Sequence, residues 1–262
     1  MLAGWSRLIL RDSPRWQQDV LHEFSRAAPA YDAHARLQRA VAWRLAALCQ
    51  RLPIRRGLWV DLGSGTGLLA EALETLHPGQ RLTRLDGSQA MLSMQPAGST
   101  TLLWGLQNGL PPWQEPPRLL ASSFCLHWLE HPEQQLQHWF RALAPGDWLA
   151  VALPVEGSFP QWHTAARLSG ERCSALTFPN PQDLVANLPA EAIQHNRCCR
   201  YSQQASSAIA LLRPMRRIGA GSSPCTPLGV GGWRRLERSW PDRNGNGQIR
   251  LTWLIQILLL RR

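Results

Sequence analysis

The feature that most limits how this chain can fold is an apolar run followed at once by three closely spaced glycines. The segment LWVDLGSGTGLLAEAL, residues 58–73, places Asp61 near the end of a predicted strand and Gly63, Gly65 and Gly67 before a predicted helix. Glycine is needed where a strand turns sharply into a helix and where a ligand approaches the backbone at contact distance. The segment therefore predicts an α/β protein with a ligand at this turn.

The glycine spacing excludes two common phosphate-binding turns. A dinucleotide-binding turn has the pattern G-x-G-x-x-G, but Leu68 occupies the position of its third glycine, and no P-loop lysine follows. A strand-to-helix turn without a ligand is the alternative. Asp86, at the end of the next predicted strand, favours a ligand, because a carboxylate there can accept hydrogen bonds from both hydroxyls of a ribose. A helix cap is the other interpretation of Asp86.

Strands and helices alternate through the middle of the chain. Strands are predicted at 57–62, 81–86, 101–105, 118–123 and 148–153, with helices at 67–76, 88–94 and 132–143. This alternation is typical of a doubly wound, mostly parallel sheet with right-handed crossovers. Two late strands, near 197–203 and 249–259, would complete a seven-stranded sheet.

We expect one domain, residues 1–262, because a chain of this length can bury one sizeable core. Its predicted parts are an N-terminal helical cover at 13–50, a core at 57–154, a cap or lid at 155–195, and C-terminal strands and helices at 196–262. The cap is predicted because Pro, Gly and Ser become frequent after the fifth strand.

The composition excludes some chemistries and leaves several partners open. The chain has 28 Lys+Arg against 18 Asp+Glu, a net charge of +10, and every basic residue is arginine. Without lysine it cannot form a lysine Schiff base, which excludes pyridoxal enzymes and aldolase-type catalysis. The arginine excess favours an anionic partner but does not choose among nucleic acid, a membrane surface and an acidic protein.

Cysteine usage and the two ends of the chain predict a cytoplasmic protein. The six cysteines form no C-x-x-C pair and no histidines have zinc-ligand spacing, so no metal site is expected. The opening MLAGWSRLIL matches a signal peptide poorly. The closing IRLTWLIQILLLRR falls short of the about 20 apolar residues that cross a bilayer, and it predicts a buried strand.

The glycine loop resembles the S-adenosylmethionine loop of the class I methyltransferases. From about Phe24 to the end, the chain further resembles one family of them, the malonyl-acyl-carrier-protein O-methyltransferases of biotin synthesis. The segments that carry this resemblance are FSRAAPAYDAHARLQR (24–39), VDLGSGTG, LTRLDGSQAML, CLHW (125–128), GSFPQW (157–162), MRRIGA (215–220) and LERSWP (236–241).

The resemblance implies a Rossmann-like fold and S-adenosylmethionine as cofactor. The implied cofactor-binding residues are Asp61, Gly63, Ser64, Gly65, Gly67, Asp86, Gly87 and Gln107. Three positions depart from the family pattern. Leu106 stands where an acidic residue usually faces the adenine, Arg118 replaces an acidic residue, and Ser123 stands where asparagine is common.

The implied reaction transfers a methyl group to the free carboxylate of a malonyl thioester. Carboxyl groups titrate near about 4, so the acceptor is ionised and needs no general base. Alignment and removal of water would then provide the acceleration. We interpret Tyr31 and His127 as catalytic and His34 and Trp128 as substrate-binding, with Gln38 near the methyl group. Ordinary packing is the alternative for each.

The resemblance also implies an acidic partner, an acyl carrier protein bearing a malonyl group, or malonyl-coenzyme A. Arg216 and Arg217 are candidate substrate-binding residues, because a guanidinium can pair with a carboxylate, a phosphate or acidic helices. A basic face would also steer the encounter.

Two other functions stay open. The first is methylation of another small metabolite or of RNA, although aromatic and basic residues are not interleaved as in base-stacking proteins. The second is a non-catalytic binding protein without cofactor, which the departures at Leu106 and Arg118 would allow.

Overall fold

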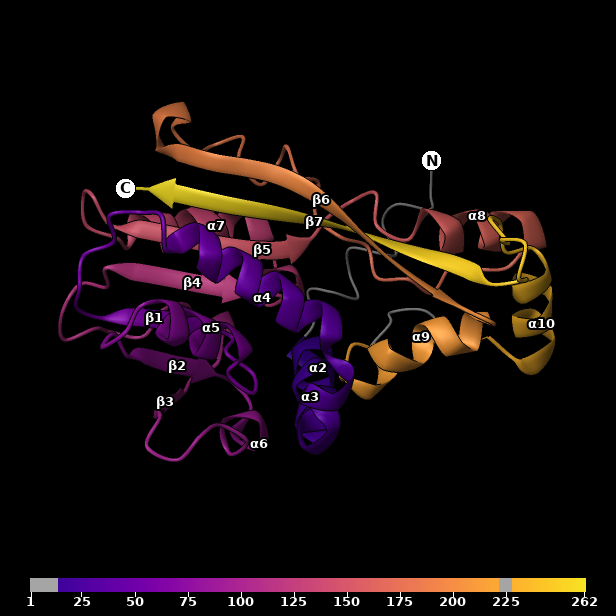
Figure 1. Ribbon diagram of the computed structural model, residues 1–262, viewed down its shortest axis with the longest axis horizontal. Helices are drawn as coiled ribbons and strands as arrows, with labels where there is room; N and C mark the ends of the chain where they lie inside the picture. The colour runs from indigo at the N-terminus through magenta and orange to yellow at the C-terminus, as the bar shows by residue number, and fades with distance from the viewer. Residues whose placement is uncertain (1–13, 222–227) are drawn as a thin grey trace.

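A seven-stranded sheet with helices on both faces forms the body of the protein (Figure 1). The computed structural model describes residues 14–221 and 228–262, so the opening segment discussed above lies outside the described residues. The strands are β1 (Trp59–Leu62), β2 (Leu82–Asp86), β3 (Thr100–Leu103), β4 (Leu119–Ser123), β5 (Trp148–Pro154), β6 (Ile193–Ala205) and β7 (Ile249–Arg261).

The strand order is β3-β2-β1-β4-β5-β7-β6, with β1 to β5 parallel and β7 antiparallel to both of its neighbours. The chain order reverses beside β1, the strand that leads into the glycine loop. Ligands bind at such a switch point, beyond the carboxyl ends of the strands. The predicted fold class, a doubly wound and mostly parallel sheet, is confirmed.

Nine α-helices surround the sheet in the described part of the chain. They are α2 (Pro14–Ala27), α3 (Tyr31–His34), α4 (Arg36–Cys49), α5 (Leu68–Leu76), α6 (Gln89–Leu92), α7 (Pro132–Arg141), α8 (Pro160–Ser169), α9 (Ala208–Arg217) and α10 (Val230–Arg238).

Alternate side chains of each central strand enter two separate cores. In β4, Leu119 and Ala121 join the core that contains α4 and α5, while Leu120 joins the core that contains Leu136 of α7. Successive side chains of a strand point to opposite faces, so continuous apolar strands predict helices on both sides of the sheet.

The last two strands are longer than predicted and extend beyond the parallel core. The helices α8, α9 and α10 gather around their extended ends (Figure 1). The closing apolar segment forms β7, a largely buried strand, as expected. None of the helices in residues 14–221 and 228–262 is long and apolar enough to cross a membrane.

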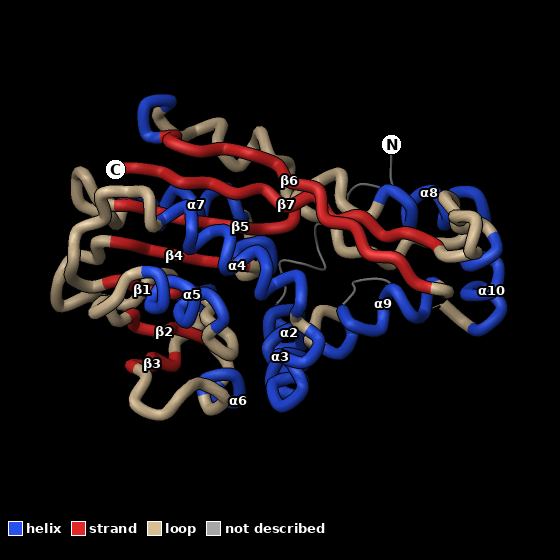
Figure 2. Tube along the Cα trace, in the orientation of Figure 1, coloured by secondary structure: helices blue, strands red, loops and turns tan. Residues whose placement is uncertain are grey.

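The N-terminal helices lie beside the carboxyl edge of the parallel strands (Figure 2). α2 contacts α6, and α3 contacts α9. The predicted cap at 155–195 contains α8 and a long irregular segment, of which Leu176 and Phe178 line a cavity described below. Its role as a lid stays a prediction.

Candidate functional site

The loop after β1 depends on glycine at three positions. Gly63, Gly65 and Gly67 have φ of 70°, 54° and 97°, which lie in the left-handed region. A Cβ on Gly63 would lie 2.2 Å from the Cys125 Sγ, so this glycine is needed for packing. A Cβ on Gly65 would meet no atom within 4 Å, and Gly65 lines a cavity. Its bare backbone is therefore open to a ligand.

The loop uses its own backbone donors internally. The N–H groups of Gly63 and Ser64 both donate to the Leu85 carbonyl, at 2.8 and 2.9 Å, and that of Gly65 donates to the Asp86 carboxylate at 2.8 Å. Phosphate-binding loops instead point free N–H groups at the ligand. The loop thus suits a ligand without phosphate at this position, such as the expected S-adenosylmethionine.

Asp86 stands at the tip of β2 with part of its accepting capacity unused. Its Oδ2 accepts from Gly65 and its Oδ1 from the backbone N–H of Ser88, both at 2.8 Å. A carboxylate offers about four acceptor sites, so about two remain for vicinal hydroxyls of a ribose. Burial raises the pKa of Asp86 above its ordinary value, and the backbone donors oppose that shift.

Asp61 supports the loop from below. Its side chain is 1% exposed and accepts from the Ala70 N–H in the first turn of α5 at 3.1 Å. Burial raises the pKa of Asp61 to about 7, opposed by the Ala70 N–H and the Arg84 charge. Asp61 also lines the cavity. Its direct contact with a cofactor stays a prediction.

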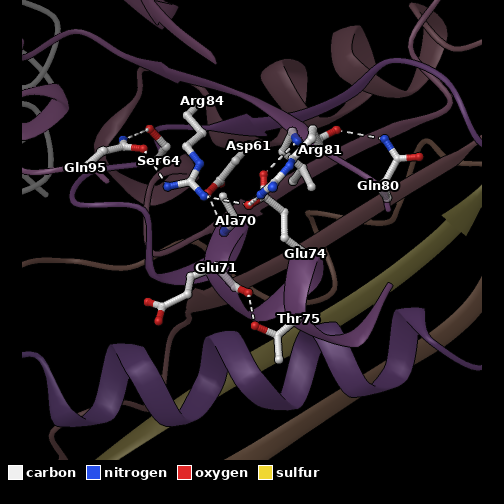
Figure 3. A network of polar contacts seen from close by, with 11 residues as sticks. Asp61, Ser64, Ala70, Glu71, Glu74, Thr75, Gln80, Arg81, Arg84 and Gln95 are labelled. Atoms are coloured by element: carbon white, nitrogen blue, oxygen red, sulfur yellow. Dashed lines mark hydrogen bonds and ion pairs between the residues drawn. The ribbon is translucent and has the colours of Figure 1, made fainter. Parts of the chain in front are cut away.

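A buried arginine on β2, Arg84, lies beneath the glycine loop and connects it to α5 through polar contacts (Figure 3). Arg84 is 3% exposed and pairs with Glu74 at 2.9 Å, while its Nη1 donates to Gln95 at 3.1 Å. Gln95 in turn donates to the Ser64 hydroxyl at 2.9 Å and the Gly65 carbonyl at 2.8 Å. A Cβ on Gly67 would lie 2.7 Å from the Arg84 Nη1, so a glycine is needed here to leave room for the arginine.

Two side-chain hydrogen bonds fasten the N-terminal helices over the loop. The Thr66 hydroxyl donates to Asp32 at 2.6 Å, and the hydroxyls of Ser25 and Ser88 lie 2.7 Å apart. Both bonds join the N-terminal segment to turns at the carboxyl edge of the sheet. They hold the predicted cover against the ligand site.

A cavity with about 1010 Å³ of empty space, part of it open to solvent, lies on this loop. Of the predicted cofactor residues, all but Gly67 line it: Asp61, Gly63, Ser64, Gly65, Asp86, Gly87 and Gln107. The residues present therefore fit S-adenosylmethionine.

A second cavity, with about 1450 Å³ of empty space, is walled mainly by aromatic rings. The Phe159 and Trp253 rings, for example, lie 4.4 Å apart in an edge-on arrangement. The rings that line it are Phe24, Tyr31, Phe124, His127, Trp128, Phe159, Trp162, Phe178, Trp233 and Trp253. We call it the aromatic cavity, and the first one the cofactor cavity.

Five residues line both cavities and form a shared wall: Phe24, Tyr31, Gln38, Phe124 and Trp128. A ligand in one cavity would therefore lie beside a ligand in the other. Burial, with the negative charges of Asp86 and Asp32, raises the pKa of Tyr31, so its hydroxyl stays protonated at neutral pH.

The other predicted catalytic and substrate residues lie in different places. His127 is 3% exposed and lines only the aromatic cavity, with its ring 5.6 Å from that of Phe178. His34 lines neither cavity, so the structure does not support it as an acceptor-binding residue. His34 is the last residue of the short α3.

An arginine-rich groove lies between α2 and α9. It is lined by Arg26, Arg213, Arg216 and Arg217 with Glu23, and Arg216 also lines the aromatic cavity. Arg26 pairs with Glu23 at 2.6 Å. Within the described ranges, Arg216 and Arg217 have no ion pair. The groove thus carries uncompensated positive charge next to the aromatic cavity.

The three departures from the family pattern leave the cofactor cavity intact. Arg118 precedes β4 at the amino edge of the sheet and pairs with the buried Asp147 at 3.3 Å, so it does not reach the cofactor cavity. Arg118 therefore makes no direct contact with the cofactor cavity. Leu106 and Ser123 do line the cavity, where they supply an apolar surface and a hydroxyl.

Sequence reasoning missed several residues that shape the site. Arg84 carried a signal, since a charged residue interrupts an apolar strand there. Gln95 and Thr66 carried none, because their partners depend on how distant segments pack. Phe178 and Trp253 reach the aromatic cavity from segments with no recognised motif.

Comparison with known proteins agrees with this site. Residues 60–151 match the family model of the methyltransferase domain. The chain is 29% identical over 255 residues to a malonyl-[acyl-carrier protein] O-methyltransferase of Alcanivorax borkumensis, covering 91% of this chain and 84% of the relative.

Two solved structures share the fold. A structure described as a putative methyltransferase from Bacillus halodurans superposes with a TM-score of 0.59 at 12% identity, covering 83% of this chain and 97% of its own. The plantazolicin methyltransferase BpumL, solved with S-adenosylhomocysteine (SAH), superposes with a TM-score of 0.52 at 13% identity, covering 99% and 100%. The domain match and the relative support S-adenosylmethionine-dependent methyl transfer for this chain, and the two solved structures show that it shares the fold of these methyltransferases.

Proposed function

We propose that the protein methylates the free carboxylate of a malonyl group carried by an acyl carrier protein, an early step of biotin synthesis. The relative from Alcanivorax borkumensis bears that activity in its name and aligns over most of both chains. The resemblance in the flanking segments points the same way.

The observation that carries the proposal is the shared wall between the two cavities. Methyl transfer needs the acceptor oxygen in line with the bond that breaks, and holding two reactants in that geometry supplies much of the acceleration. Tyr31, Phe124 and Trp128 belong to both cavities. An acceptor in the aromatic cavity would therefore meet the methyl group there.

The chain must bind and dehydrate an acceptor that is already ionised. When bound, S-adenosylmethionine supplies an electrophilic methyl group. The aromatic rings exclude water, which strengthens the attraction between carboxylate and sulfonium and leaves the acceptor oxygen poorly solvated. Asp86, Gly65 and Gln107 would hold the cofactor from the opposite side.

The arginine-rich groove supports an acidic carrier as the partner. Arg216 lines both the groove and the aromatic cavity, so a carrier docked on the groove could deliver its thioester arm into the cavity. Arg213 and Arg217 lie on the same helix. Positive charge of this kind raises the rate of encounter with an acidic protein.

The direct test follows methyl transfer from labelled S-adenosylmethionine to malonyl-carrier protein, with malonyl-coenzyme A and acetyl-carrier protein in parallel. We expect a base-labile ester on the malonyl carrier and none on the acetyl carrier. Cofactor binding without transfer would contradict this acceptor and direct the search to other small carboxylates or RNA. A cofactor-less binding protein is not favoured, because seven of the eight expected cofactor-binding residues line the cofactor cavity.

A further inference from the structure

The side-chain amide of Gln38 stands in the shared wall between the two cavities. Gln38 lies in the first turn of α4, is 7% exposed and lines both cavities. Its side-chain amide forms no hydrogen bond with any residue in 14–221 or 228–262. Because Gln38 lines both cavities, its amide is available to donate to a ligand in either one.

The shared wall is otherwise poor in hydrogen-bond donors. Phe24 and Phe124 have none, and the remaining donors besides Gln38 are the Tyr31 hydroxyl and the Trp128 indole N–H. On the cofactor side, the polar group best placed for a sugar is an acceptor, the Asp86 carboxylate. A carboxylate substrate accepts only, so it needs donors from this wall.

We propose that the Gln38 side-chain amide donates to the acceptor carboxylate and selects substrates that end in a free carboxylate. This inference rests on the proposed function. In this arrangement Gln38 donates to the carboxylate oxygen that does not attack the methyl group. The attacking oxygen of the same carboxylate then has no hydrogen bond from Gln38.

A neutral donor suits this reaction better than a charged one. Negative charge on the carboxylate falls as the new O–CH₃ bond forms and the sulfonium–CH₃ bond breaks, with both electrons of that bond going to sulfur. An arginine at this place would stabilise the ionised acceptor more than the transition state and would slow the chemistry. An amide orients the acceptor while it withdraws less of its charge.

The test compares Gln38→Met, Gln38→Glu and the matched control Gln134→Met, an exposed glutamine on α7. Met keeps the size and removes the donor, while Glu also places a like charge opposite the acceptor. Each variant is measured for kcat/KM with malonyl-carrier protein. The dissociation constant of S-adenosylmethionine is measured for each variant. The dissociation constants of malonyl-carrier and acetyl-carrier protein are measured with the enzyme saturated with SAH.

We expect Gln38→Met to lower kcat/KM about tenfold and to lower the preference for malonyl over acetyl carrier by a similar factor, since a hydrogen bond to a charged group has about that worth. Gln38→Glu should lower kcat/KM by a larger factor, because its carboxylate would repel the acceptor. Cofactor affinity should stay within about threefold, and Gln134→Met should match the wild type in every assay.

Three results would overturn the inference. An unchanged malonyl preference in Gln38→Met would refute it while the proposed function stands. If Gln38→Met lowered the affinity for S-adenosylmethionine by the same factor as kcat/KM, Gln38 would be a cofactor-binding residue instead. A wild type that binds cofactor but does not methylate malonyl-carrier protein would remove the proposed function, and this inference with it.

Discussion

The two cavities are built in different ways. The polar part of the cofactor cavity comes from short turns after β1 and β2, where Gly63, Gly65 and Asp86 act through backbone geometry and backbone hydrogen bonds. The aromatic cavity comes from side chains of segments as far apart as Phe24 and Trp253. The cofactor, which many enzymes share, would thus be bound by backbone groups of neighbouring turns. The methyl acceptor, which is specific to this enzyme, would be bound by side chains from segments far apart in the sequence.

This difference predicts that the two cavities can be damaged separately. Changes in the turns should affect cofactor binding and stability, whereas changes among the rings should affect the acceptor. The following variants test that separation.

The largest effect should come from the pH dependence of stability through Asp61. Because its folded-state pKa is about 7 against an ordinary 3.8, the folded protein holds an extra proton between these values. The proton bound to Asp61 therefore stabilises the folded protein. This stabilisation is fully present at pH below about 4 and is lost as the pH rises through 7, so the free energy of unfolding should fall by on the order of 4 kcal/mol across that range. Asp61→Asn should remove that slope.

Urea unfolding at pH values from 4 to 8 measures this. The exposed Asp19 provides a matched control, and Asp19→Asn should keep the wild-type slope. If the free energy of unfolding changed equally with pH in the wild type and in Asp61→Asn, burial would not raise the pKa of Asp61 in the folded protein.

Asp86→Ala should weaken S-adenosylmethionine binding by about 100-fold or more. The change removes the expected ribose contacts and the acceptor for the Gly65 N–H, and hydrogen bonds to a charged group are worth about 1.5–3 kcal/mol each. Calorimetric titration measures the affinity. Asp183→Ala, at an exposed position, should bind as the wild type does, and an equal affinity in Asp86→Ala would contradict the assignment.

Phe178→Ala should lower kcat/KM for the acceptor about tenfold and leave cofactor affinity unchanged. Phe178 lines only the aromatic cavity, where it packs against Phe159 with ring centres 5.5 Å apart. Loss of such a ring costs about 1–2 kcal/mol of contact. Leu168→Ala, at an exposed position, is the control. A comparable loss of cofactor affinity would show that the cavities are not separable.

The smallest effect should follow charge reversal in the arginine-rich groove. Arg213→Glu with Arg217→Glu should lower kcat/KM for the carrier-bound acceptor about fivefold at low salt, and the difference should vanish at about 1 M salt, where charges are screened within about 3 Å. A malonyl thioester without carrier should be unaffected. Arg141→Glu, exposed on α7, is the control. A salt-independent loss would argue against docking.

The sequence predicted the parts whose chemistry is local. The glycine loop and Asp86 could be located because each follows a strand at a fixed place, and their backbone requirements show directly in the residue types. The partners of Arg84 could not be predicted, since Glu74 and Gln95 reach it only in the packed fold.

The N-terminal helices show why the acceptor side was harder to predict. In one continuous helix, Tyr31, His34 and Gln38 would share a face by their spacing. The chain leaves helical geometry at Ala35, with φ −87° and ψ 39°, so α3 and α4 are separate helices. Tyr31 and Gln38 line the cavities and His34 does not. Tyr31 and His34 belong to the same short helix, so the spacing in the sequence could not show which of the two would line a cavity.

The place of β7 has a consequence for the order in which the protein can assemble. β7 lies between β5 and β6 in the sheet, yet it follows β6 in the chain (Figure 1). During synthesis from the N-terminus, β1 to β5 can pair with one another as they emerge, but β6 then has no neighbouring strand. Its edge stays unpaired until β7 is made, and in that interval it is open to pairing with another chain. Before β7 is made, the sheet can therefore contain at most five strands, and both the β5 edge and β6 lack the neighbour that they have in the finished protein.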